Sequence, residues 1–122
     1  MTRPDRVARA TAIAEAALDK KCQQLVALDV REVTSVADTF ILVTGTSDRH
    51  ARAIADSVVE AARRTGEKPL GIEGYEEGRW VLIDLGDVIV HVFQEEVRAV
   101  YDLERLWSDA PALAVDEAGA AH

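Results

Sequence analysis

The chain lacks the cysteine pairs of disulfide scaffolds and cysteine-based metal centres, and the long apolar run of a membrane span. It contains one cysteine, Cys22, which excludes an internal disulfide, a CxxC pair and a cysteine-based zinc site. No apolar run approaches the roughly 20 residues that a membrane-spanning helix needs. Because the opening residues also lack the apolar block of a secretory signal, we expect a cytoplasmic protein.

Positive charge is scarce in the second half of the chain. Residues 67–96 contain eight aspartates and glutamates against two lysines and arginines, whereas residues 1–66 are nearly balanced. Phosphate groups bind to clustered Lys and Arg, so this half is poorly suited to direct sequence-specific binding of nucleic acid. This charge distribution would suit a basic protein as partner, but charge alone favours the other interpretation, an acidic surface that is only solvated.

Apolar periodicity predicts one α/β domain in which helical and strand-like segments alternate. The predicted helices cover residues 6–21, 48–65 and a stretch from about 95, and the predicted strands cover residues 25–30, 39–44, 70–73, 79–85 and 88–93. Ser47 is a suitable cap for the second helix, and Gly66 a suitable end. The expected order is α-β-β-α-β-β-β-α, with the first two strands paired and a flexible tail over residues 110–122.

Two aspartates and a histidine near the centre of the strand-rich half raise the question of catalysis. Magnesium-dependent nucleotidyl transfer needs two carboxylates on one strand face, but Asp84 and Asp87 are three residues apart with Gly86 between them. They are better placed to shape a tight turn by accepting backbone hydrogen bonds. His91 lies in a run that is apolar on both faces, which is typical of a central strand and favours a structural role.

Trp80 and Leu82 alternate with the aliphatic residues of the same predicted strand. If Val81 and Ile83 face the core, Trp80 and Leu82 face either solvent or the underside of the first or last helix. The sequence leaves both orientations open. A tryptophan and a leucine on an exposed sheet face, surrounded by acidic residues, would have the composition of an interface hot spot.

Several segments, in one order, resemble the ribosomal silencing factor family, also called RsfS or Iojap. They are TGTS at residues 44–47, EG at 73–74, WVLIDLGDVIVH at 80–91 and YxLExLW at 101–107. The resemblance covers about residues 10–109, and we expect a family domain over residues 1–109. It implies an α/β fold with a mixed sheet of about five strands, similar to nucleotidyltransferases but without their catalytic carboxylates.

The resemblance also implies a function that needs no enzyme activity and no cofactor. Members of this family are expected to bind protein uL14 of the large ribosomal subunit and to block joining of the small subunit sterically, which lowers translation when nutrients are scarce. The partner-facing motif of the family falls on Trp80, Leu82, Asp84, Asp87 and Tyr101.

Two alternatives stay open beside this reading. One is a small nucleotidyltransferase-like enzyme that would use Asp84, Asp87 and His91 with magnesium. The other is a homodimer of the free protein, which would compete with the ribosomal partner for the sheet face that carries Trp80.

Overall fold

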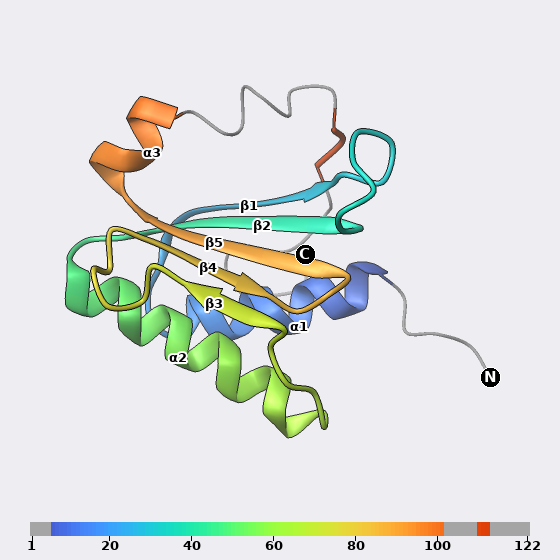
Figure 1. The fold of residues 1–122 in the computed structure, drawn as a ribbon, viewed down its shortest axis with the longest axis horizontal. Coiled ribbons are helices and arrows are strands. Elements are labelled where there is room, and N and C mark those ends of the chain that lie inside the picture. The colour runs from blue at the N-terminus through green and yellow to red at the C-terminus, as the bar shows by residue number, and fades with distance from the viewer. Residues whose placement is uncertain (1–5, 102–109, 113–122) are drawn as a thin grey trace.

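A five-stranded mixed sheet with helices on both faces forms the protein, and the computed structural model describes residues 6–101 and 110–112 (Figure 1). The elements are α1 (Arg6–Leu18), β1 (Gln23–Asp29), β2 (Thr39–Gly45), α2 (Asp48–Arg64), β3 (Gly71–Glu73), β4 (Trp80–Asp84), β5 (Val88–Gln94) and α3 (Glu95–Tyr101). The predicted fold class and element order are confirmed.

The strands lie in the order β1-β2-β5-β4-β3. The neighbouring strands β2 and β5 are parallel, and every other pair is antiparallel, including the expected pairing of β1 with β2. All of β5 except Gln94 is buried, which confirms that the strand carrying His91 is central. The outer strand β3 has only three residues and is the exposed edge of the sheet.

The long helix α2 begins and ends where the sequence predicts. Ser47 accepts a hydrogen bond at its Oγ from the backbone nitrogen of His50, which satisfies one of the unpaired amides of the first turn. At the other end Gly66 has φ of +85°, and the backbone nitrogen of Glu67 donates to the carbonyl of Ala62. The buried stripe also matches the prediction: Ala51, Ile54, Ala55, Val58 and Ala62.

The sheet divides the core into two layers. On the side covered by α1 and α2, here called the α1/α2 face, the buried residues are almost all aliphatic, and they include Val81 and Ile83 of β4. The opposite side, here called the α3 face, carries Phe40, Phe93 and the buried His91, with Val97 of α3 packed against it. Figure 1 shows α3 and the helix pair on opposite sides of the sheet.

Three residues of the expected tail are described, and they contact β1. The carbonyl of Pro111 accepts a hydrogen bond from the backbone nitrogen of Asp29 at 2.8 Å, Ala112 forms an isolated bridge with Leu28, and Ala110 is buried. The rest of the predicted tail, and the continuation of the last predicted helix through Trp107, lie outside the described residues. No helix in the described part is long and apolar enough to cross a membrane.

Candidate partner-binding face

Trp80 and Leu82 lie side by side on the α3 face, each half-buried. Neither of the two predicted orientations describes them fully, because α3 covers their surroundings only in part. Beside them is a groove of about 540 Å³, here called the Trp80 groove. Its lining combines an apolar floor with a charged rim: Glu73, Gly74, Glu77, Arg79, Trp80, Leu82 and Val97.

The indole of Trp80 is held in place from below by β5. Its Nε1 donates a hydrogen bond to Nδ1 of His91 at 3.2 Å, across the β4–β5 pair. The ring also packs against Phe93, with centroids 5.2 Å apart. A tryptophan whose polar atom is satisfied inside the protein presents a defined apolar edge to a partner, at a lower entropic cost than a free side chain.

His91 serves this arrangement as a neutral hydrogen-bond acceptor. It is 5% exposed, and burial lowers its pKa from the usual 6.5 to about 4. Because Nδ1 accepts from Trp80, the ring proton of the neutral form resides on Nε2. Among the described residues Nε2 has no hydrogen-bond partner. A neutral, enclosed imidazole that supports a neighbouring side chain agrees with the predicted structural role.

Gly74, at the start of the hairpin loop between β3 and β4, also shapes this groove. Its φ is +78°, and a Cβ at this position would lie 2.1 Å from the carbonyl oxygen of Trp80. No side chain fits that space without moving the backbone of β4. The glycine therefore allows the loop to pass directly against Trp80.

The two aspartates of the motif serve different parts of the structure. Asp84 accepts a hydrogen bond at Oδ1 from the backbone nitrogen of Gly86 at 2.9 Å, as predicted for a turn residue. The Asp87 carboxylate instead binds Arg9 of α1 through two hydrogen bonds, of 2.7 and 3.0 Å. Arg9 also forms a two-bonded pair with Glu67. Asp87 thus fastens α1 to the β4–β5 turn and does not join Trp80 and Leu82.

The residues of the enzyme alternative do not form one site. Asp84 caps a turn, Asp87 is paired with Arg9, and His91 lies beneath Trp80. Within residues 6–101 and 110–112, no group of three or more His, Cys, Asp or Glu side chains is arranged to hold a metal ion. The geometry therefore gives each of these three residues a structural partner.

One buried charge on the α3 face was missed by the sequence analysis. Arg98 of α3 is 6% exposed, and its Nη1 donates to Oγ1 of Thr44 at 2.9 Å. Its guanidinium carbon lies 6.0 Å from the centroid of the Phe93 ring. Helical spacing gave no signal for it, because Arg98 directly follows Val97 and adjacent residues lie about 100° apart around a helix. The remaining predicted contact, Tyr101, lies at the end of α3, and its side chain is outside the described part.

Comparison with known proteins gives consistent matches over most of the chain. The family model described as "Ribosomal silencing factor during starvation" matches residues 3–122, a longer range than the residues 10–109 over which the resemblance was noted. The ribosomal silencing factor RsfS of Halalkalibacterium halodurans is 46% identical over 98 residues, covering 80% of this chain and 84% of that protein.

A solved structure and a more distant relative extend these matches. The crystal structure of a Chromobacterium violaceum protein aligns with a TM-score of 0.80 at 39% identity, covering 96% of this chain and 97% of that one. A mouse protein named "Mitochondrial assembly of ribosomal large subunit protein 1" is 31% identical over 74 residues, covering 58% of this chain and 32% of that protein. On the evidence of the family model and the bacterial relative, the chain belongs to the ribosomal silencing factor family.

Proposed function

We propose that this protein represses translation by binding protein uL14 of the large ribosomal subunit and sterically preventing the small subunit from joining, under nutrient limitation. Family membership supports a ribosome-associated silencing role. The name of the mouse relative connects that protein with the large ribosomal subunit. In this proposal the protein acts in the cytoplasm, where the bacterial ribosome works.

The observation that carries the proposal is the half-exposed pair Trp80 and Leu82 in a groove with an acidic rim. Aromatic and aliphatic anchors in partly desolvated pockets dominate binding energy at many interfaces. The glutamates Glu73 and Glu77 line the same groove and suit the Lys and Arg side chains of a ribosomal protein. Such charges mainly guide association and select the partner.

The proposed contact consists of Trp80 and Leu82 as apolar anchors, with Asp84 beside them on the same strand face and Tyr101 on α3. Asp87 is the sequence prediction that fits this contact least, because its carboxylate is engaged by Arg9. In the proposed mechanism the protein only has to occupy a surface of the large subunit, and it catalyses no reaction. A standard interface of about 800 Å² per partner suffices.

Binding to isolated large subunits tests the proposed face. We expect the Trp80→Ala/Leu82→Ala variant to lose co-sedimentation with large subunits while its circular dichroism and unfolding transition stay cooperative. Val36→Ala is the matched control, because Val36 is 65% exposed and lies outside the groove. Undiminished binding by the folded double variant would remove this face from the proposal.

Subunit joining and nucleotide binding test the proposed mechanism against the enzyme alternative. Light scattering of mixed small and large subunits should show less association with the wild-type protein and normal association with the double variant. Calorimetry with nucleotides and magnesium addresses the alternative. Micromolar binding that is lost in Asp84→Asn would favour the enzyme.

Self-association of the free protein is a third property to measure. A homodimer that uses the sheet face with Trp80 would bury the proposed ribosome contact. Light scattering with and without uL14 would then show dimer and complex excluding each other. A dimer that persists in the complex would mean that the two contacts use different surfaces.

A further inference from the structure

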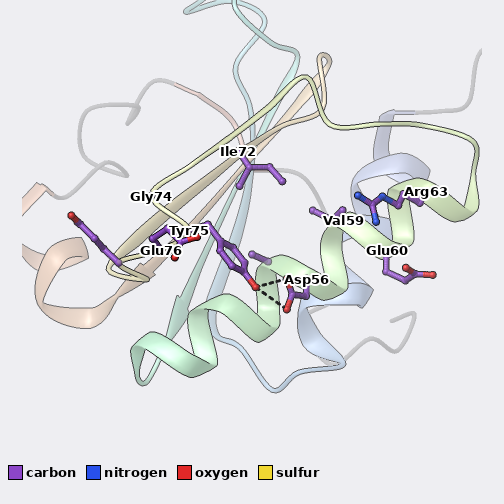
Figure 2. Close-up of a pocket in the computed structure, with 10 residues that line it drawn as sticks. Asp56, Val59, Glu60, Arg63, Ile72, Gly74, Tyr75 and Glu76 are labelled. Carbon is purple, nitrogen blue, oxygen red and sulfur yellow. Dashed lines mark hydrogen bonds between the residues drawn. The ribbon is translucent and has the colours of Figure 1, made fainter.

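A second groove lies on the other side of the edge strand, between α2 and the hairpin loop. It has a volume of about 800 Å³, and its lining comes from α2, from β3 and from the loop before β4: Ala55, Asp56, Val59, Glu60, Arg63, Ile72, Gly74, Tyr75, Glu76 and Glu77. We call it the α2 groove. Figure 2 shows Tyr75 reaching from the loop to Asp56 on the helix, with Ile72 and Val59 farther along the groove.

The shape of the α2 groove is maintained by contacts across it. The hydroxyl of Tyr75 donates to the carboxylate of Asp56, 2.9 Å from Oδ1 and 3.2 Å from Oδ2. The Tyr75 ring packs against the aliphatic core of the α1/α2 face. On the helix side, Arg52 donates from Nη1 to the carbonyl of Glu76 at 3.0 Å. These contacts fix the loop to α2 and leave the apolar floor accessible between them.

The groove and the adjoining edge strand combine exposed apolar surface with negative charge. Ile72 is 42% exposed and Leu70, directly before β3, is 75% exposed. Four carboxylates line the groove, against one arginine: Asp56, Glu60, Glu76 and Glu77. The outer edge of β3 pairs with no strand of the described residues, since β3 is the last strand of the sheet. An extended segment can add to such an edge through main-chain hydrogen bonds.

Charge decides what kind of segment fits. Acidic residues beside a short edge strand are also a common device against unwanted pairing of sheet edges. They repel a second copy of this acidic edge and they repel RNA phosphates, but they attract lysine and arginine. We propose that the β3 edge and the α2 groove bind an extended segment of a basic protein, in which an aliphatic side chain enters the groove between flanking basic residues.

This contact is separate from the one proposed for Trp80. Ile72 pairs with Ile83 of β4 and lies toward α2, whereas Glu73 pairs with Leu82 and lies toward the Trp80 groove. The two grooves thus flank opposite sides of the same edge strand and share only the loop residues Gly74 and Glu77. Because most of their lining differs, the two grooves can be altered separately, and neither proposal depends on the other.

A titration of the full-length protein with a defined peptide tests the inference. The probe is a blocked Lys-Val-Lys-Val-Lys peptide, followed by amide shifts in NMR spectra, and the matched control is Glu-Val-Glu-Val-Glu. We expect shifts at β3 and α2 with the basic peptide, slower hydrogen exchange of outward-facing β3 amides, and no saturable shifts with the acidic one. Equal binding of both peptides, or shifts centred elsewhere, would overturn the proposal.

Charge variants separate a specific site from general attraction to an acidic protein. Glu60→Gln/Glu76→Gln removes two exposed carboxylates of the groove, and we expect about fivefold weaker peptide binding. Glu15→Gln/Glu32→Gln makes the same change in net charge at exposed sites outside the groove and should weaken binding less than twofold. An equal loss in both double variants would contradict the site.

A last variant makes this inference distinguishable from the proposed ribosome contact. Trp80→Ala/Leu82→Ala should bind the basic peptide as the wild-type protein does. If that variant loses the peptide while Glu60→Gln/Glu76→Gln retains it, the peptide binds in the Trp80 groove, and the α2 groove proposal fails.

Discussion

The two faces of the sheet differ in the side chains that line them and in how far helices cover them. The α1/α2 face is closed by two helices and filled with aliphatic side chains, and Val81 and Ile83 on it are fully buried. The α3 face is lined by aromatic rings around His91, and it is only partly covered at Trp80 and Leu82. The first face is therefore fully enclosed, whereas the second leaves apolar surface partly exposed at Trp80 and Leu82.

Strand β4 shows this division within five residues. Its burial alternates strictly, with Val81 and Ile83 inside and Trp80, Leu82 and Asp84 at intermediate exposure. Successive side chains of a strand point to opposite faces, so a single substitution can address one face and spare the other. The comparison between the faces can thus be tested with neighbouring residues that share one backbone environment.

Ile83→Ala and Leu82→Ala should give the largest contrast. Ile83 is 0% exposed, so its truncation leaves a cavity and should cost about 3 kcal/mol of unfolding free energy. Leu82 is half-buried beside a groove, and its truncation should cost about 1 kcal/mol or less, because less surface returns to water. Urea unfolding of both variants measures the difference, and co-sedimentation with large subunits should be lost only in Leu82→Ala.

Val81→Ala is the internal control for this contrast, since it lies on the same face as Ile83 and is equally buried. It should destabilise the protein and leave ribosome binding intact wherever the protein is folded. Equal destabilisation by Leu82→Ala and Ile83→Ala would mean that the α3 face is packed as tightly as the α1/α2 face. The proposed difference between the two faces would then not hold.

Gly74→Ala addresses the support of the α3 face. The added Cβ would lie 2.1 Å from the carbonyl oxygen of Trp80 at a φ of +78°, so the loop or β4 must shift. We expect a loss of about 2 kcal/mol in unfolding free energy, and a change in tryptophan fluorescence because Trp80 moves. Gly71→Ala is the matched control, because a Cβ there meets no atom within 4 Å. Similar behaviour of the two variants would show that the loop adapts freely.

Most of the fold could be predicted from the sequence, because it depends on local signals. The alternation of apolar residues located the strands, and Ser47 and Gly66 marked the ends of α2. The exposure of Trp80 could not be predicted in the same way. Periodicity showed that Trp80 and Val81 face opposite sides, but how far α3 covers one side depends on the path of the chain after β5.

Contacts between distant segments were the other part that sequence patterns did not reveal. Arg9 and Asp87 are 78 positions apart, and nothing local in either segment indicates that they meet. The same holds for the pairing of Trp80 with His91, which needs the register of β4 on β5. The α2 groove also depends on the docking of a hairpin loop on a helix, so its lining could not be assembled from motifs.

The low pKa of His91 predicts a pH dependence that belongs to the α3 face. The folded-state pKa of about 4 lies below the unfolded value of about 6.5, so the unfolded chain binds the proton more readily. Stability from this group is complete above pH 6.5 and is lost as the pH falls toward 4. Between pH 7 and pH 5 the wild-type protein should lose about 1 to 2 kcal/mol more than His91→Phe.

Chemical unfolding of both proteins at the two pH values measures this difference, and the carboxylates that they share cancel in the comparison. Protonation of the folded protein also removes the acceptor for Trp80 Nε1, so the indole fluorescence of the wild-type protein should change only as the pH falls toward 4. Parallel pH profiles of the two proteins would mean that His91 titrates with an ordinary pKa and that the α3 face is open to water at this point.

Removing an ion pair of Arg9 should have the smallest effect on the unfolding free energy. It tests the contrast between the two faces at α1, away from Trp80. Arg9 and Asp87 retain 17% and 38% side-chain exposure, so solvent screens their attraction. We expect Asp87→Asn to cost about 0.5 to 1 kcal/mol, and less in 1 M salt. A double-mutant cycle with Arg9→Gln measures the coupling between the two side chains.

Because this pair fastens α1 to the β4–β5 turn, Asp87→Asn should bind large subunits as the wild-type protein does, whereas Leu82→Ala should not. A loss of binding in Asp87→Asn without loss of stability would return this carboxylate to the partner contact, and the α3 face would then extend around the β4–β5 turn.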